Sequence, residues 1–448
     1  MHDVERVTVI GGGLAGSEAT WQLASRGIPV DLIEMRPRVS SPAHHGDRLA
    51  ELVCSNSFKS DDPTTASGML KRELTVLGSL LITVARETAV PAGAALAVDR
   101  SAFSAAVTAR LESHPLVRVV RQEATQMPEH GSVVVATGPL TSPGFEPALS
   151  RLVGPSRLAF FDAAAPVIDA ASLDADVVFA ASRYGKGEGA DYLNCPMERD
   201  EYEHFIDELL EAKRVIRKEF ETEDLFQACQ PVEEVARRGR DALRFGALKP
   251  VGLTDPRTGR RPWAVVQLRP ENRAGTAYNL VGFQTNLTFA EQARVFRSIP
   301  GLAHADFLRY GVMHRNTFVD APRLLRPDLA LIAEPRVRLA GQVVGTEGYL
   351  EAVASGLVAA LGIVAERRGV PPLALPRTTA FGALLAYATD PDTCPYQPMH
   401  VNFGLLPTLD PPVKSKRERY AAYAARGQAE LAATLASRPD LFEDAVRA

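Results

Sequence analysis

Two cysteines of this chain lie in polar surroundings, where a thiol can take part in chemistry. Cys54 follows a polar loop and precedes Lys59, and Cys229 precedes the arginine-rich segment 237–240. Neighbouring cations lower the pKa of a thiol and raise its fraction of thiolate, which is the nucleophilic form. A lone cysteine is more often a small buried hydrophobic residue. The sequence therefore indicates either a pair of reactive thiols or two core residues.

The remaining candidates for chemistry are one histidine and two further cysteines. His314 lies in the polar run 313–317, where it either faces a ligand or is a hydrogen-bonded core residue. Cys195 and Cys394 adjoin prolines and lack a cationic context, so we expect structural roles for them. The four cysteines are far apart and form no C-x-x-C pair, so we expect neither structural disulfides nor a zinc site.

Basic residues concentrate in the middle of an acidic chain. The whole chain has a net charge of -4, whereas residues 229–340 contain 18 Lys and Arg against 10 Asp and Glu, a net charge of +8. A basic region on an acidic protein is what a local polyanion site requires. The alternative is a set of solvated arginines paired with neighbouring acids.

These side chains need a scaffold, and the N-terminus predicts one that binds a dinucleotide. The apolar runs 7–10 and 30–34 indicate two strands, with a glycine-rich turn and a helix between them. Gly11, Gly13 and Gly16 have the G-x-G-x-x-G spacing, which allows a tight turn, close approach of a pyrophosphate and close packing of helix on strand. Glu34 lies 18 residues after Gly16, close to the spacing of an acid that binds a ribose hydroxyl. The alternative is a glycine-rich turn in some other α/β protein.

A second glycine turn lies toward the other end of the chain. The strand-like run 337–342 leads into Gly345-Thr346-Glu347-Gly348-Tyr349, and a helix of small residues is expected over 350–360. A helix N-terminus of this kind can hold a phosphate. A cofactor site formed from both ends of the chain favours FAD over NAD, because FAD-binding Rossmann domains are commonly interrupted by a substrate domain.

The middle of the chain lacks the strand–helix alternation of its ends. An acidic helix is expected within 198–224, followed by strands near 263–268, 278–284 and 307–312. We therefore predict an α/β fold in which a Rossmann-type FAD-binding domain is interrupted by an inserted α+β domain. The expected segments are 1–193 for the first part, 194–325 for the insertion, and 326–448 for the second part with a C-terminal helical tail.

Length and composition indicate a soluble globular protein. The 448 residues are too many for one ordinary core, so two or three domains are expected. We find no apolar run long enough to span a bilayer and no basic region followed by an apolar segment that would mark a secretory signal. These features predict a cytoplasmic protein without membrane attachment.

Taken together, the motifs resemble those of one family. The chain is similar to the folate- and FAD-dependent tRNA (uracil-5-)-methyltransferases, TrmFO, within the GidA-related flavoproteins. The motifs around the two cysteines are the specific ones, whereas the glycine motif is shared with the longer GidA-type proteins. Two departures are Gly12, where alanine is common, and Thr346, where a small apolar residue is expected. The similarity is carried by residues 11–19, 34–37, 42–44, 52–57, 90–93, 96–100, 191–197, 229–233, 249–253, 313–317, 347–349 and 402–407.

This resemblance implies methyl transfer to C5 of the T-loop uridine of tRNA. The carbon would come from 5,10-methylenetetrahydrofolate, and the reducing equivalents from FAD reduced by NADPH or NADH. The residue chemistry agrees, because a thiolate added at C6 turns C5 into an enolate-like carbon that can attack a methylene group. The C5 proton must then leave to a base, and reduced flavin can supply the hydride.

The resemblance also implies roles for individual residues. Cys54 and Cys229 would be the nucleophile and the acid/base, in an order that stays open. His314 would stack on the folate pterin, and Tyr349 would pack against the flavin ring. The tRNA phosphates would meet Arg237, Arg238 and Arg240. The expected FAD-binding residues are Gly11, Gly12, Gly13, Leu14, Ala15, Gly16, Glu34, Arg36, Thr137, Gly138, Gly345, Glu347, Gly348 and Tyr349. No metal and no obligate protein partner are expected.

Other functions remain open from the sequence. A GidA-like enzyme would modify the wobble uridine together with a partner protein, but the shorter chain and the Cys-Ser-Asn-Ser motif at 54–57 weigh against it. A small-molecule flavin oxidoreductase would make the basic middle only solvated surface. A tRNA-binding protein that has lost catalysis is disfavoured by the presence of both cysteines.

Overall fold

A parallel five-stranded sheet is built from both ends of the chain. Its strand order is β16-β7-β1-β2-β6. The edge strand β16 comes from late in the chain, whereas the central strand β1 comes from its start. Runs of β-branched residues such as VTVI and VVV favour these buried strands. The strands are β1 (Val7–Ile10), β2 (Val30–Glu34), β6 (Val117–Arg121), β7 (Val133–Val135) and β16 (Val337–Leu339). The strands expected at 7–10, 30–34 and 337–342 are thus confirmed, the last in shorter form.

The computed structural model describes residues 5–41, 43–154, 157–163, 165–187, 189–215, 230–311, 313–394 and 396–442. Only the backbone is described for the strand at 157–163 and for residues 313–317.

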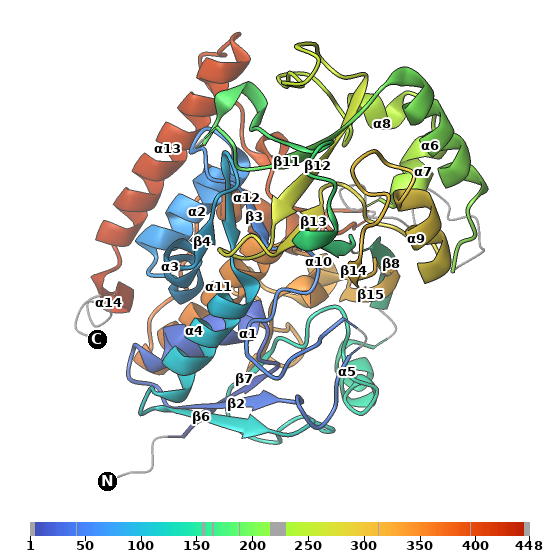
Figure 1. The fold of residues 1–448 in the computed structure, drawn as a ribbon. Helices are drawn as coiled ribbons and strands as arrows, with labels where there is room; N and C mark the ends of the chain where they lie inside the picture. The colour runs from blue at the N-terminus through green and yellow to red at the C-terminus, as the bar shows by residue number, and fades with distance from the viewer. Residues whose placement is uncertain are drawn as a thin grey trace.

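Helices cover the parallel sheet and connect it to the C-terminal tail (Figure 1). Several begin at side-chain caps: Thr65, Asp99 and Ser415 each accept a hydrogen bond from a backbone N–H in the first turn. The helices of this part are α1 (Leu14–Ala24), α2 (Ala66–Val76), α3 (Leu80–Glu87), α4 (Arg100–Glu112), α5 (Glu146–Val153), α10 (Ala321–Leu324), α11 (Tyr349–Arg368), α12 (Ala380–Thr389), α13 (Lys416–Ala436) and α14 (Pro439–Phe442).

The helix α11 is the central helix of this part. It packs against α1 so closely that a Cβ atom on Gly356 would lie 2.1 Å from the carbonyl oxygen of Ala15. By length and composition alone α11 could cross a membrane, so the expectation that no apolar run is long enough was wrong. Its most apolar window is 89% buried inside the protein, which explains the composition, because a helix surrounded by protein is hydrophobic on all sides.

The second sheet is antiparallel and has the strand order β10-β11-β12-β13-β9-β14. It lies with α6, α7, α8 and α9 in the upper right of Figure 1, away from the parallel sheet. Its strands are β9 (Val167–Asp169), β10 (Phe179–Ala180), β11 (Leu193–Met197), β12 (Ala264–Pro270), β13 (Ala277–Leu280) and β14 (Phe307–Arg309). Its helices are α6 (Arg199–Glu211), α7 (Val232–Arg237), α8 (Ala242–Phe245) and α9 (Phe289–Phe296).

An antiparallel ribbon carries the chain into and out of the second sheet. Its strands are β8 (Arg157–Ala163) and β15 (Met313–Val319), paired along their whole length. The second sheet begins at β9, upstream of residue 194, and β11 runs across that position. The domain boundaries at residues 194 and 326 therefore stay a prediction. In the structure, the ribbon separates the strands of the second sheet from those of the parallel sheet along the chain.

A small sheet beside the helices holds one of the two cysteine motifs. Its strands are β3 (Ser57–Ser60), β4 (Ala89–Val90) and β5 (Ala95–Val98), in the order β3-β5-β4. The loop that leads into β3 contains Cys54, which places this cysteine next to the N-terminus of α11.

Candidate active site

The glycine turn after β1 packs α1 against the strand and leaves space at the helix N-terminus. A Cβ atom on Gly16 would lie 1.8 Å from the carbonyl oxygen of Gly11, so only glycine allows this packing. Gly13 is the N-cap of α1, and a Cβ atom there would meet no heavy atom within 4 Å. The unpaired N–H groups of this helix end therefore border a space that fits a pyrophosphate.

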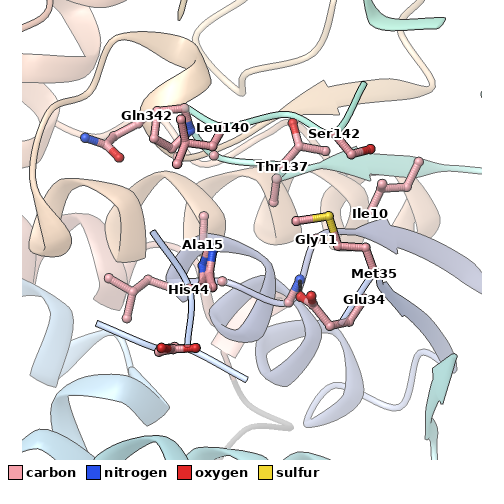
Figure 2. Close-up of a pocket in the computed structure, with 18 of the residues that line it drawn as sticks. Ile10, Gly11, Ala15, Glu34, Met35, His44, Thr137, Leu140, Ser142 and Gln342 are labelled. Carbon is pink, nitrogen blue, oxygen red and sulfur yellow. Dashed lines mark hydrogen bonds between the residues drawn. The ribbon is translucent and has the colours of Figure 1, made fainter. Parts of the chain in front are cut away.

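That space belongs to a cavity that is partly open to solvent and lined by segments from both ends of the chain. Figure 2 shows Ala15, Glu34, Thr137 and Gln342 around it, contributed by α1, β2, the turn after β7 and the turn before α11. Eleven expected FAD-binding residues line it: Gly11, Gly12, Gly13, Leu14, Ala15, Glu34, Arg36, Thr137, Gly138, Gly348 and Tyr349. The glycine cradle and this lining fit FAD, and the contacts of each residue with FAD stay predictions.

Three expected FAD-binding residues lie outside the lining and shape the turns behind it. Gly16 makes the helix–strand contact described above. Gly345 has a φ of 83°, and its missing side chain leaves room for the hydroxyl of Tyr396. Glu347 accepts a hydrogen bond of 2.5 Å from Nε2 of Gln342, which itself lines the cavity.

Glu34 is held as an ionised carboxylate at the end of β2. Its Oε2 accepts a hydrogen bond of 2.8 Å from the Gly12 N–H, and its Oε1 pairs with Nε of the buried Arg36 at 2.8 Å. Burial opposes ionisation, but the Arg36 guanidinium outweighs it and holds the pKa of Glu34 below its ordinary value. A fixed carboxylate beside the glycine turn is suited to accept from a ribose hydroxyl.

His44 lines the same cavity, although the sequence marked it only within the motif 42–44. Burial, followed by the charge of Arg36, lowers the pKa of His44 to about 4, so its imidazole is neutral at pH 7. Its Nδ1 lies 2.6 Å from Oγ of Ser41. Other lining residues that sequence reasoning missed are Ile10, Ile33, Met35, Glu51, Val53, Gln122, Ala124, Ala136, Pro139, Leu140, Ser142, Phe145, Gly341, Gln342 and Ala352.

Cys54 lies directly after a cavity-lining residue, Val53, and is half-buried. The backbone N–H groups of Cys54 and Ser55 donate to the hydroxyl of Tyr349 at 2.8 and 3.1 Å. Burial, followed by the nearby Cys54, raises the pKa of Tyr349, so its hydroxyl stays protonated. Because Tyr349 begins α11, one hydroxyl joins the cysteine loop to the glycine turn of the cavity.

Two arginines from distant parts of the chain hold the other side of the cysteine loop. Arg100 and Arg309 each donate a terminal N–H to the carbonyl oxygen of Cys54, at 3.1 and 3.2 Å. Lys59, the cation that the sequence placed near this thiol, pairs instead with Glu351 at 3.2 Å. The two arginines could not be identified from spacing, because they lie 46 and 255 residues from Cys54.

Asn56, the amide residue of the Cys-Ser-Asn-Ser motif, has a structural role. Its side chain is completely buried and donates to the carbonyl oxygens of Val98 and Pro270, both at 2.9 Å. Its Oδ1 accepts from Nε of Arg269 at 2.8 Å. The motif is therefore bonded both to the small sheet and to strand β12 of the second sheet.

Cys229 lies within residues 216–229, outside the described residues. The segment that follows it is anchored to the loop after β13: Val232 donates its N–H to the Gln284 carbonyl at 2.7 Å. The buried Glu233 accepts from the Asn286 N–H at 2.7 Å and from Oγ1 of Thr285 at 3.0 Å. Burial raises the pKa of Glu233 to about 7.

The remaining candidates for chemistry are distributed over the ribbon, the second sheet and the surface. His314 lies in β15 with its backbone opposite Asp162 of β8, and its side chain is outside the description. Cys195 is buried in β11, where burial raises the pKa of its thiol, as a structural residue requires. Cys394 is exposed.

The three candidate tRNA-binding arginines lie at the end of α7 and just after it, and all are exposed. Arg237 donates to the Leu210 carbonyl at 3.1 Å, and Arg240 pairs with Asp207 at 2.6 Å. Arg238 extends from the C-cap of α7. The structure therefore places the three together, with two of them already bonded to α6.

Comparison with known proteins gives a consistent family. The family described as "Glucose inhibited division protein A" matches residues 6–371. The chain is 55% identical to the "Methylenetetrahydrofolate--tRNA-(uracil-5-)-methyltransferase TrmFO" of Moorella thermoacetica, over 94% of this chain and 96% of that protein. It is also 55% identical to the protein of the same name from Geobacter sulfurreducens, over 95% of this chain and 98% of that one.

Among solved structures, Aquifex aeolicus GidA has the same fold. Its form II crystal structure superposes with a TM-score of 0.65 at 17% sequence identity, covering 86% of this chain and 67% of GidA. The form I structure gives the same TM-score and covers 69% of GidA. At this identity the likeness concerns the fold alone, and it confirms the Rossmann-type FAD-binding fold with an insertion.

Proposed function

The chain belongs to the TrmFO family of methylenetetrahydrofolate–tRNA-(uracil-5-)-methyltransferases, and from this premise we propose how its residues carry out the reaction. The protein is a FAD- and folate-dependent tRNA uracil-5-methyltransferase. It transfers the methylene carbon of 5,10-methylenetetrahydrofolate to C5 of the T-loop uridine and reduces it to a methyl group, giving 5-methyluridine. The residues that line the cavity would hold FAD, which, once reduced by NADPH or NADH, would supply the hydride.

The observation that carries this proposal is the hydroxyl of Tyr349, which bonds the loop of Cys54 to the N-terminus of α11. Val53, Gly348 and Tyr349 all line the cavity that fits FAD, so the loop of Cys54 is held at the edge of that cavity. A thiol next to a flavin is the arrangement that uracil methylation with a folate carbon requires, because covalent activation and reduction act on the same ring.

Cys54 and Cys229 are proposed as the catalytic pair. One thiolate adds to C6 of uracil, and the other acts as the acid/base that takes the C5 proton. Either role needs a thiolate at neutral pH. A protonated Tyr349 hydroxyl fixes the backbone of Cys54 in both cases.

The second sheet, its helices and the ribbon of β8 and β15 are proposed to supply the substrate side. His314 in β15 stacks on the folate pterin, and Arg237, Arg238 and Arg240 beside α7 meet tRNA phosphates. The segment proposed for this side is 194–325, between FAD-binding segments 1–193 and 326–448, and β9 and β10 of the second sheet precede it. A cytoplasmic location is proposed because tRNA and reduced nicotinamide are cytoplasmic substrates.

A GidA-like modification of the wobble uridine is not favoured. The relatives at 55% identity bear the methyltransferase name, whereas the likeness to Aquifex aeolicus GidA, at 17% identity, extends to the fold only.

The proposal is tested by transfer of label from the methylene carbon of methylenetetrahydrofolate to a tRNA transcript, with FAD and reduced nicotinamide present. A transcript with cytidine in place of the T-loop uridine is the substrate control. Label should enter only the uridine transcript, and Cys54→Ala and Cys229→Ala should each abolish it while keeping the flavin spectrum. Full activity in either variant removes that cysteine from the mechanism, and no label from yellow, folded wild-type protein overturns the function.

A further inference from the structure

Positive charge exceeds negative charge around the loop of Cys54. Arg100 begins α4, Arg269 lies in β12, and Arg309 ends β14. Glu271 forms an ion pair with Arg100 through both carboxylate oxygens. Among the described residues no second carboxylate forms an ion pair with this group, so three guanidinium groups and one carboxylate leave a net charge of +2 beside the cysteine.

The second sheet places two of these arginines in one row. Arg269 is paired with Asn279, Asn279 with Val167, and Val167 with Arg309, across strands β12, β13, β9 and β14. Residues paired across neighbouring strands project from the same face of a sheet, but the register of β14 shifts between Phe307 and Arg309, so it is the contacts of Arg309 that place it beside the cysteine loop. Arg269 reaches the cysteine loop through Asn56, and Arg309 reaches it through the carbonyl of Cys54.

Among the three arginines, Arg309 has the guanidinium group that is least compensated by acids and hydrogen-bond acceptors. Its Nη2 donates to the Cys54 carbonyl at 3.2 Å, while its buried Nε has no hydrogen-bond partner among the described residues. Burial, followed by the charge of Arg100, lowers the pKa of the Arg309 guanidinium. An uncompensated cation in partly desolvated surroundings acts more strongly on a neighbouring thiol than a solvated one would.

We propose that Arg309 is a positioning residue that fixes the carbonyl of Cys54 together with Arg100 and keeps Cys54 in its thiolate form at neutral pH. This inference rests on the proposed catalytic role of Cys54. The charged and titratable groups around the thiol are Arg100 from α4, Arg269 from β12, Arg309 from β14 and the hydroxyl of Tyr349 from α11, and Glu271 after β12 is paired with Arg100. Residues of the second sheet thereby contribute to the reactivity of a cysteine in the FAD-binding part.

The test is the pH dependence of alkylation of Cys54 by iodoacetamide, a neutral reagent, in the full-length FAD-loaded protein. The background carries Cys229→Ser and Cys394→Ser, which leaves the buried Cys195 as the other thiol. Adding Cys54→Ala to this background shows how much of the signal comes from Cys54. Arg309→Met should move the alkylation profile to higher pH by about one unit, which slows the reaction about tenfold at pH values below the midpoint of the parent profile.

Two further variants separate the charge from the fold. Arg309→Lys keeps the charge without the planar fork, so its rate at pH 7 should lie closer to the parent than to Arg309→Met. Arg297→Met is the matched control: this arginine, at the C-cap of α9, donates to the Ala305 carbonyl and lies over the ring of Phe307, so its loss should leave the profile unchanged. If Arg309→Met fails to bind FAD, the alkylation profile of Arg309→Lys tests the inference instead. A profile of Arg309→Lys that lies at as high a pH as that of the thiol in unfolded protein overturns the role of charge.

The outcomes distinguish this inference from the proposed function. Superimposed profiles for the parent and Arg309→Met, or an equal displacement in Arg297→Met, overturn the inference even if the parent enzyme methylates tRNA. A displaced profile specific to Arg309 supports it even if label transfer fails, in which case the proposed function alone is wrong.

Discussion

At the residue scale, two glycines of one turn differ in what a side chain would meet. The position of a Cβ atom on Gly13 is open, whereas a Cβ atom on Gly16 would lie 1.8 Å from a backbone oxygen. Gly13→Val should therefore fold but exclude the pyrophosphate, giving colourless protein. Flavin absorbance after purification, with circular dichroism to confirm folding, measures the result.

Gly16→Val is the matched comparison. Its side chain collides with the carbonyl oxygen of Gly11 in the turn after β1, so the variant should lose stability whether or not FAD is added, with a lower melting temperature of the apoprotein. A yellow, active Gly13→Val protein would show that the pyrophosphate lies elsewhere.

At the element scale, a buried carboxylate joins two helices. Glu73 of α2 accepts the N–H groups of Ala380 and Phe381 at the start of α12, at 2.6 and 3.0 Å. Burial raises the pKa of Glu73 from 4.5 to about 7, so the folded state holds a proton that the unfolded chain releases between these values. The stabilisation from this proton is fully present below pH 4.5 and is lost as the pH rises through about 7.

The prediction concerns the difference in unfolding free energy between wild type and Glu73→Gln. The free energy of unfolding of wild type minus that of Glu73→Gln should be larger at pH 5 than at pH 8, by on the order of 2 kcal/mol, because the variant has no carboxyl proton to lose. Denaturant unfolding at both pH values measures it. The comparison must be a difference, because the buried Glu233 also has a pKa raised to about 7 and titrates in the same direction. A difference that is equal at both pH values contradicts the prediction.

At the scale of the whole molecule, the proposed tRNA-binding arginines lie far from the edge of the parallel sheet. In Figure 1, α7 lies at the upper right and β6 at the bottom. Replacing Arg237, Arg238 and Arg240 with Ala should weaken tRNA binding and flatten its dependence on salt concentration, because each phosphate contact releases counterions. Titrations at several salt concentrations give the slope.

The control removes the same charge from the opposite end of the molecule. Arg110, Arg118 and Arg121 lie on α4 and β6 and pair with Glu87, Asp31 and Glu112. Replacing these three with Ala should leave the salt slope unchanged. Equal slopes for wild type and both triple variants would place the tRNA surface on another part of the protein.

What the sequence determined by itself was local. The spacing of Gly11, Gly13 and Gly16 fixed the strand–turn–helix unit, because the contact of Gly16 with Gly11 depends on residues five apart. The second glycine turn of the chain, which precedes α11, was predicted in the same way, from glycines followed by a run of small residues. The motifs around Cys54 and Cys229 were enough to indicate the family, because they hold specific residues at short range.

Only the tertiary structure decided what surrounds the cysteine. The sequence offered Lys59 as the neighbouring cation, but Lys59 pairs with Glu351, and Arg100 and Arg309 hold the loop instead. Likewise, Glu73 meets the start of α12 only because helices far apart in the chain pack together. Charges act through space and helices pack through surfaces, so partners that are distant in sequence become known only when the chain is folded.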